Sequence, residues 1–187
     1  KNVDVSNLIG SDRFGASISL NTAGDRLAVG AENEDRGFNG SSGIGAAYLF
    51  SFTDTDFTGG TLESTIGSGN TGGKNLDVSN LDDGDGFGSS VSLNGVGDRL
   101  AVGAPNDDGA ENALGSNNAG SAYLISFTDT DFNGGTLESI VGKDYVGGKN
   151  VDLPNLAPDV RGDEFGSAVS LNSAADRLAV GAIFDNG

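Results

Sequence analysis

Short stretches of alternating polar and apolar residues, separated by glycine- and asparagine-rich runs, recur along the whole chain. Ser90–Leu93 alternates polar and apolar residues, which is typical of a strand with one face in a core. Arg99–Ala104 is almost entirely apolar or small, which predicts a strand buried on both faces. Residues 121–127 and 136–141 are predicted to form a third and a fourth strand. No segment shows a helical period, so the pattern predicts an all-β chain of strands in up-and-down order.

The same set of strands returns after about 75 residues, which makes the chain a repeat protein. Four motifs carry the repetition, and they begin at Lys1, Lys74 and Lys149; at Phe14, Phe87 and Phe165; at Asp25, Asp98 and Asp176; and at Phe52 and Phe127. The last motif occurs only twice. We therefore predict repeat units over residues 1–73, 74–148 and 149–187, with the third unit holding about half of the template.

A single four-stranded sheet of this kind cannot cover both of its faces. Stacking successive sheets face to face would bury them, and radial stacking gives a β-propeller of 4–8 blades. Small residues such as Gly103 and Ala122 fit this arrangement, because sheets that converge leave little room for side chains. A β-sandwich is the alternative, but such domains usually need about 100 residues, which is longer than the repeat. The predicted fold is two and a half blades of a β-propeller.

The order of the motifs resembles a known family. Phe87-Gly88, a strand, Gly103-Ala104-Pro105 and then Tyr123 are similar to the FG-GAP repeat, the blade repeat of integrin α-chain propellers and of many bacterial extracellular proteins. The run Gly24–Ala31 resembles repeats of very long bacterial surface proteins. The resemblance implies a propeller blade, an extracellular or cell-surface location in a bacterium, and an excerpt of a larger chain.

The family's usual calcium loop is not matched in this sequence. Many FG-GAP blades carry an Asp-x-Asp-x-Asp-Gly loop between their first two strands, whereas Asn94–Asp98 offers one carboxylate there. A calcium ion needs 6–8 oxygen ligands, so this connection is too short to enclose one. We expect Asp98 to pair with Arg99 or to cap the turn, and the equivalent Asp-Arg pairs to do the same.

A second set of carboxylates is a candidate metal site. The loop before the first strand and the loop after the second should lie at the same end of a blade. The candidate ligands in these loops are Asp82, Asp83, Asp85, Asp107 and Asp108. They could hold a hard cation such as Ca²⁺. The competing interpretation is a pair of solvated acidic loops, and the uneven spacing of the acids in the other two repeats favours it.

The sequences Asp54-Thr55-Asp56 and Asp129-Thr130-Asp131 recur identically in the hairpin between the third and fourth strands. Asp and Thr side chains bond nearby backbone N–H groups and favour turns. We therefore expect these residues to form turns, with cation binding as the alternative.

Composition narrows the range of functions. The chain has 27 acidic and 10 basic residues, a net charge of −17, and no Cys, His, Met or Trp. Such a charge disfavours binding to nucleic acid or to an anionic membrane, and no apolar run approaches a membrane span. Without His or Cys there is no imidazole base and no thiol nucleophile. We expect no enzyme, although a hydrolase or lyase using Asp83 and Asp85 is the third hypothesis.

The sequence thus predicts a non-catalytic extracellular repeat module of a large bacterial surface protein, with a structural or adhesive role. Its expected partners are neighbouring repeats of the same or another copy. The alternative is a ligand-binding propeller that recognises a glycan or protein through its end loops, assisted by Ca²⁺. The loop at residues 105–119 and Arg161 are the modest departures from the template that would favour this alternative.

Overall fold

The computed structural model describes residues 3–5, 8, 10–35, 43–54, 56–110, 118–156 and 162–185. These residues form β-strands joined by turns and loops, so the predicted all-β class is confirmed. Within the same residues, no helix is long and apolar enough to cross a membrane.

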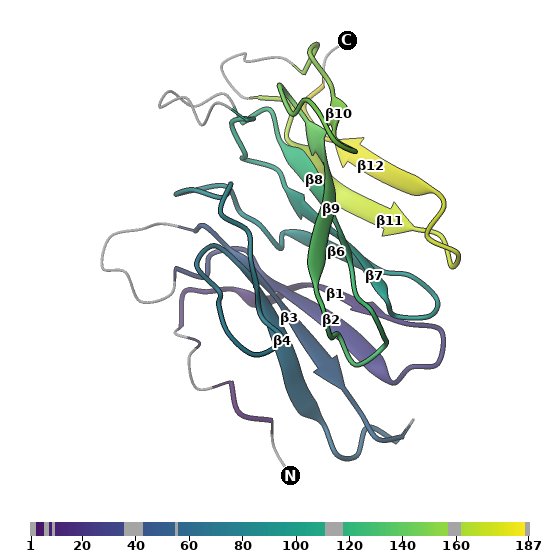
Figure 1. Ribbon diagram of the computed structural model, residues 1–187. Coiled ribbons are helices and arrows are strands. Elements are labelled where there is room, and N and C mark those ends of the chain that lie inside the picture. The colour runs from purple at the N-terminus through teal and green to yellow at the C-terminus, as the bar shows by residue number, and fades with distance from the viewer. Residues whose placement is uncertain are drawn as a thin grey trace.

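Each complete repeat forms one sheet whose strands follow chain order (Figure 1). Blade 1 consists of β1 (Phe14–Leu20), β2 (Arg26–Ala31), β3 (Ala46–Ser51), β4 (Thr61–Gly67) and β5 (Leu76–Asp77). Blade 2 consists of β6 (Ser90–Leu93), β7 (Arg99–Ala104), β8 (Ser121–Ser126), β9 (Thr136–Gly142) and β10 (Val151–Asp152). Blade 3 contains β11 (Phe165–Leu171) and β12 (Leu178–Ala182). The first four strands of blades 1 and 2 are antiparallel neighbours, as the repeat predicted.

A short fifth strand at the outer edge of each sheet was not predicted. Leu76 pairs with Ile66 in parallel, and Val151 pairs with Val141 in the same way. The chain turns back for this pairing after Gly72 and Gly73, whose φ angles of 83° and 60° suit glycine. β5 therefore belongs to blade 1 although it falls within residues 74–148, so the sheets and the repeat units have different boundaries.

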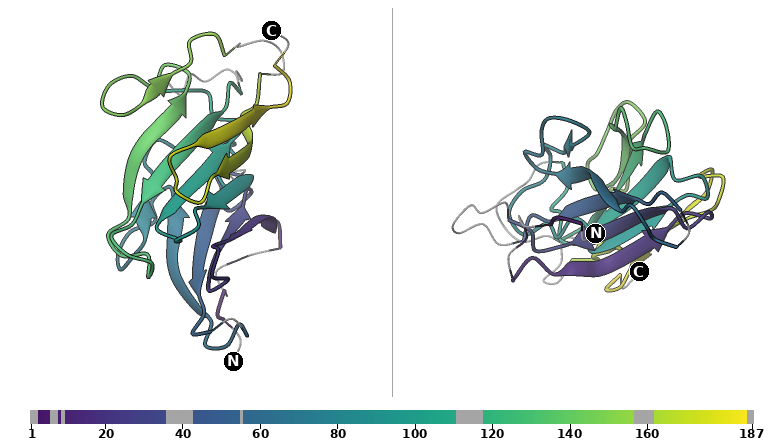
Figure 2. Two further views of the ribbon diagram at one scale, coloured as in Figure 1. Left: turned by 90° about the vertical axis from the view of Figure 1, so that its right-hand side faces the viewer. Right: turned by 90° about the horizontal axis from the view of Figure 1, so that it is seen from below.

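The sheets stack in an open row, with blade 1 at one end and β11–β12 at the other (Figures 1 and 2). The innermost strands β1, β6 and β11 contact one another in succession. Side chains on β3 show how both faces are buried. Tyr48 and Phe50 join a cluster on one face of blade 1, whereas Ala47 and Leu49 join the cluster that blade 1 shares with blade 2. This stacking of antiparallel sheets is the β-propeller blade architecture that the repeat predicted.

The template glycines lie where one blade touches the next. Phe87 forms a parallel bridge with Gly45 of blade 1, and Phe165 forms the same bridge with Gly120 of blade 2. A Cβ on Gly45 or Gly120 would lie 2.0 Å from the carbonyl oxygen of the facing phenylalanine. Since atoms cannot approach so closely, only glycine allows the blades to meet at this distance. The glycines at these junctions are therefore a packing requirement of the repeat.

Serine side chains join the blades at their inner strands. Ser17 donates its hydroxyl to the carbonyl of Gly88 at 2.8 Å, and Ser90 makes the equivalent bond to Gly166 at 2.7 Å. All four residues of β6 are buried. The expectation that Ser90–Leu93 has only one buried face was therefore wrong, because its serines are covered by the neighbouring blades and bonded to them.

Candidate functional site

The loops at one end of each blade meet as the topology required. The backbone N–H of Asn106, which follows β7, donates to the carbonyl of Asp85, which precedes β6, at 3.2 Å. Asn33 makes the same bond to Asp12 in blade 1 at 3.2 Å. Asp12, Asp85 and Asp163 occupy equivalent positions and are all buried. The recurring acid before each Phe-Gly pair is therefore part of the blade's internal structure.

Asp85 and Asp107 are brought together in the interior of this loop pair. Asp85 is 2% exposed and Asp107 is fully buried. Burial, and then repulsion from the Asp107 carboxylate, raise the pKa of Asp85 to about 9. Burial also raises the pKa of Asp107, and hydrogen bonds from Tyr123, Gly109 and Tyr145 partly offset this increase. At neutral pH the pair therefore holds a proton, and this proton limits the repulsion between the two carboxyl groups.

Two tyrosines hold Asp107 in place. The hydroxyl of Tyr123 donates to Asp107 Oδ2, and the hydroxyl of Tyr145 lies 3.0 Å from the same oxygen. The N–H of Gly109 donates to Oδ1 at 2.7 Å, and the ring of Phe87 packs edge-on against Tyr123 with centroids 5.3 Å apart. Burial raises the pKa of both tyrosines, so their hydroxyls stay protonated and act as donors.

Sequence reasoning missed the role of Tyr145, which the repeat alignment contains. The aligned residue of blade 1 is Asn70, so the second tyrosine belongs to blade 2 alone among the two complete blades. Glu34 is aligned with Asp107 and is also buried. From blade 1 to blade 2, Asn70 is replaced by the larger Tyr145 and Glu34 by the smaller Asp107. This paired change in size is the sequence signal that the two residues pack together.

The other three candidate ligands differ in their surroundings, and only Asp82 interacts with Asp85. Asp83 is exposed, the backbone N–H of Asp82 donates to the Asp85 carboxylate at 2.9 Å, and the Asp108 carboxylate accepts the N–H of Asn118 at 3.0 Å. In the part of the chain that the structure describes, no three acidic side chains are grouped so that they could hold a metal ion. The structure brings Asp85 and Asp107 together but does not assemble a five-carboxylate cage.

In repeat 3, Asp163 and Asp185 line a shallow pocket of about 330 Å³ together with residues 153–156. Asp163 is buried, as Asp12 and Asp85 are, whereas Asp185 is exposed. In repeat 1, Glu32 forms an ion pair with Arg13 at 2.7 Å. The acidic character of this end of the blade thus recurs with different partners in each repeat.

The hairpins between the first two strands are closed by an Asn-Asp-Arg arrangement. Asn94 Oδ1 accepts the N–H groups of Gly97, Asp98 and Arg99 at 2.9–3.0 Å, and its Nδ2 donates to the Asp98 carboxylate. Arg99 pairs with Asp98 at 3.2 Å, and the equivalent pairs of the other two repeats have the same separation. The expected ion pair is confirmed. The one carboxylate of each hairpin is already engaged, so these residues do not fit the family's calcium ion.

The Asp-Thr-Asp hairpins form turns, as predicted. Asp129 Oδ1 accepts the N–H groups of Asp131 and Asn133 at 3.0 and 3.2 Å, and Asp54 makes the equivalent bonds. Hydrogen bonds from residues 58 and 133 lower the pKa values of Asp54 and Asp129 respectively. Each first aspartate is therefore an ionised acceptor that shapes its own turn.

The second aspartate of blade 2 has a further role that the sequence did not predict. Arg26 of blade 1 donates to the Asp131 carboxylate at 2.8 Å and to the carbonyl of Thr130 at 2.5 Å. Lys74 donates to the carbonyl of Asp131 at 2.8 Å. The hairpin between β8 and β9 is thereby seated on the preceding blade. Arg26 and Asp131 are 105 residues apart, so no local sequence pattern predicts their contact.

Comparison with known proteins agrees with this geometry. The family model described as "FG-GAP repeat" matches residues 6–50 and 76–125, which together make up just over half of the chain. Each match begins ahead of a blade's first strand, the second one at β5, and ends in that blade's third strand. No curated protein matches the sequence. The repeated Phe-Gly and Gly-Ala junctions and the family match lead to one conclusion: the chain belongs to the FG-GAP repeat family.

Proposed function

We propose that this chain is a non-catalytic repeat module that builds an adhesive or display surface on the outside of a bacterial cell. The observation that carries the proposal is the repetition of one junction. Ser17–Gly88 and Ser90–Gly166 are the same bond at successive blade boundaries, as are the bridges at Gly45 and Gly120. The recurring residues join one blade to the next. Each further blade therefore extends the surface in the same way.

The placement of the charged groups supports a binding or display role over a catalytic one. The buried carboxyl pair, Asp85 and Asp107, lies beneath the surface and is bonded to tyrosines and backbone. A substrate would have to displace these contacts to reach either group. The remaining acidic residues are spread over all three repeats and contribute to the net charge of −17. Such a surface stays soluble and repels other anionic polymers.

Location and adhesion can be tested separately. For location, intact cells that produce the protein are treated with a protease and then probed with an antibody raised against this chain. Loss of the signal without cell lysis is expected, and a signal that the protease spares on intact cells would contradict the proposal. For adhesion, the fluorescent folded protein is applied to a printed glycan array and to matrix-protein surfaces. Binding that equals that of the heat-unfolded chain would exclude a specific adhesive role.

The second candidate is a ligand-binding propeller that recognises a glycan or protein through its end loops with help from Ca²⁺. The observation that favours it is the burial of Asp85 beside Asp107, since a cation would offset their repulsion as a proton does. Of the loop at residues 105–119, residues 111–117 lie outside the described residues. Calorimetric titration with CaCl₂ at pH 7 decides the point, because saturable heat that Asp85→Asn removes is expected for this candidate alone.

A further inference from the structure

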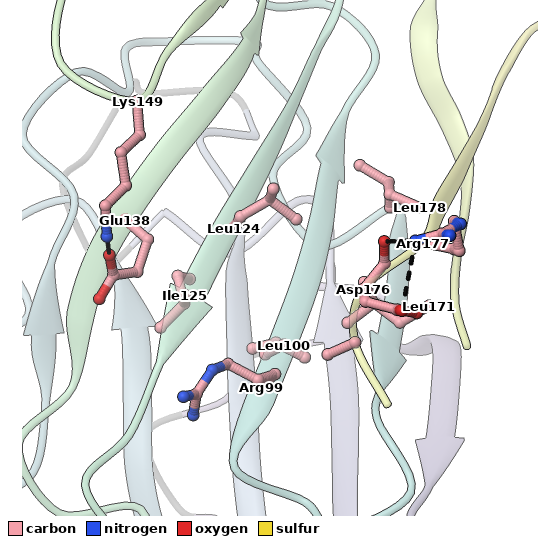
Figure 3. A pocket seen from close by; sticks show the side chains of 11 residues that line it. Arg99, Leu100, Leu124, Ile125, Glu138, Lys149, Leu171, Asp176, Arg177 and Leu178 are labelled. Atoms are coloured by element: carbon pink, nitrogen blue, oxygen red, sulfur yellow. Dashed lines mark hydrogen bonds and ion pairs between the residues drawn. The ribbon is translucent and has the colours of Figure 1, made fainter. Parts of the chain in front are cut away.

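A pocket of about 390 Å³ lies between the outer part of blade 2 and the β11–β12 hairpin. Figure 3 shows Lys149 and Glu138 on one side, Asp176 and Arg177 on the other, and leucine side chains between them. The lining thus combines an apolar floor with basic groups at its rim. Leu100, Leu124, Ile125, Leu171 and Leu178 provide the apolar part, and Arg99, Lys149 and Arg177 provide the positive charge.

This pocket in blade 2 corresponds to a site in blade 1 that is occupied by a hairpin of the next blade. Arg99 is equivalent to Arg26, and Lys149 is equivalent to Lys74. In blade 1 those two residues hold Thr130 and Asp131, the tip of the hairpin between β8 and β9. Glu138 pairs with Lys149 as Glu63 pairs with Lys74, so the basic groups are oriented in the same way at both places.

Equivalent side chains are covered at the occupied site of blade 1 and more exposed at the pocket. The Arg26 side chain is 12% exposed, whereas that of Arg99 is 44% exposed. Leu49 is fully buried under blade 2, whereas its equivalent, Leu124, is half-buried and lines the pocket. Since the residues are of the same types in the same backbone positions, the difference comes from the missing cover.

The hairpins themselves show the complementary difference. In the seated hairpin, Phe127 and Phe132 pack edge-on with centroids 5.1 Å apart, and Phe132 is fully buried. In the equivalent hairpin of blade 1, which does not sit on another blade among the described residues, Phe57 is 57% exposed. Seating therefore buries the second phenylalanine of the motif, and it engages the second aspartate, Asp131, in an ion pair although that side chain stays exposed.

We propose that the pocket is the seat of a further Phe-Thr-Asp-Thr-Asp-Phe hairpin, contributed by a third and a fourth strand that complete blade 3. Its second aspartate pairs with Arg99, its backbone carbonyls accept from Arg99 and Lys149, and its aromatic pair covers Leu124. β12 pairs with β11 alone among the described residues, so its free edge can receive the strand that leads into the hairpin. This inference concerns the joining of repeats and holds whether or not the module binds cells.

The test uses the full chain with a copy of residues 108–148 joined after Asp185, which aligns with Asp107. Arg99→Ala is introduced into the original and the extended chain, and the copied counterpart of Asp131 is changed to Asn in the extended chain. Thermal unfolding is followed by circular dichroism. Arg99 also bonds Asp98 within its own blade. The effect of Arg99→Ala in the original chain measures the loss of this local bond, and it is subtracted from the effect in the extended chain.

We expect the extended chain to melt at a higher temperature than the original. Arg99→Ala should lower its midpoint by about 2–4 °C more than it lowers that of the original chain. The copied Asp131→Asn change should remove this difference, and hydrogen exchange should show protection in the copied hairpin. An equal shift in both chains, or an unprotected copied hairpin, would overturn the proposal. Concentration-dependent self-association of the original chain that Arg99→Ala abolishes would also overturn it, in favour of a second copy as occupant.

Discussion

The carbonyl oxygen of Gly88 lies 1.8 Å from the point that a Cβ atom on Gly30 would occupy. Gly103 stands in the same relation to the carbonyl of Gly166, at 1.9 Å. A methyl group at either position would force two blades apart. The equivalent glycine of blade 3 is Gly181, where the nearest atom to such a Cβ lies 3.5 Å away. The same template position is thus crowded by the next blade in blades 1 and 2, and it is open in blade 3.

This relationship predicts that Gly103→Ala lowers the free energy of unfolding by about 1–3 kcal/mol, the usual range for overpacking. Gly181→Ala is the matched control, and we expect it to be neutral or to stabilise the chain by a few tenths of a kcal/mol. Urea unfolding at constant m-value measures both. Equal effects of the two substitutions would show that the blade contact is not what excludes a side chain at this position.

The asparagine of the first hairpin gives a second prediction. Asn94 is buried and accepts three backbone N–H groups, so Asn94→Ala leaves buried donors without partners. We expect a loss of about 1–3 kcal/mol in unfolding free energy. Asn172 makes equivalent bonds to the N–H groups of Asp176 and Arg177 but is exposed, and water can replace it there. Asn172→Ala should therefore cost clearly less in the same denaturation experiment.

The seating of the hairpin on blade 1 gives a third prediction. Arg26→Ala removes the bonds to Thr130 and Asp131 at the boundary between blades 1 and 2. We expect a loss of about 1–3 kcal/mol, because these are charge-assisted bonds of a mostly buried side chain. Arg177→Ala at the equivalent position of blade 3, whose side chain is 78% exposed, should change stability by less than about 0.5 kcal/mol. Comparable losses in both variants would argue against a seated hairpin.

The carboxyl pair makes stability depend on pH. Asp85 has a pKa of about 9 in the folded chain against an ordinary value of 3.8. Between these values the folded state holds a proton that the unfolded state has released. The free energy of unfolding therefore falls as pH rises from about 4 to about 9, by at most about 1.4 kcal/mol per pH unit from this group.

Asp85→Asn should reduce this slope, since an amide does not ionise and only Asp107 of the pair, whose pKa burial also raises, then contributes to it. Asp83→Asn in the same loop replaces an exposed side chain and should leave the slope unchanged. Unfolding midpoints in denaturant at half-unit steps from pH 5 to 9 provide the measurement. The lowered pKa of Asp129 acts in a different window, because its contribution is lost only as pH falls below about 4. A slope of the same size in Asp85→Asn and in the unchanged chain would assign it to groups other than Asp85.

Much of the fold could be predicted because its signals are local. The strands at Ser90–Leu93 and Arg99–Ala104 have the predicted ends, since Asn94 and Pro105 follow them directly and each has a clear apolar pattern. The Asp98–Arg99 pair and the Asp129 turn also involve neighbours in the chain. The burial of Asp85 and Asp107 could not be predicted in this way, because an acidic loop residue has the same sequence signature whether it is solvated or enclosed.

The sequence by itself determined the all-β class, the repeat, the strand order within a blade and the family, because a periodic template states these properties several times over. The tertiary structure decided how the blades join: that Ser90 faces a neighbouring carbonyl, that Arg26 holds Asp131, and that Tyr145 completes the bonding of Asp107. These contacts link residues that are tens to a hundred positions apart. Only the stacked arrangement brings them within bonding distance and removes the water that would otherwise solvate them.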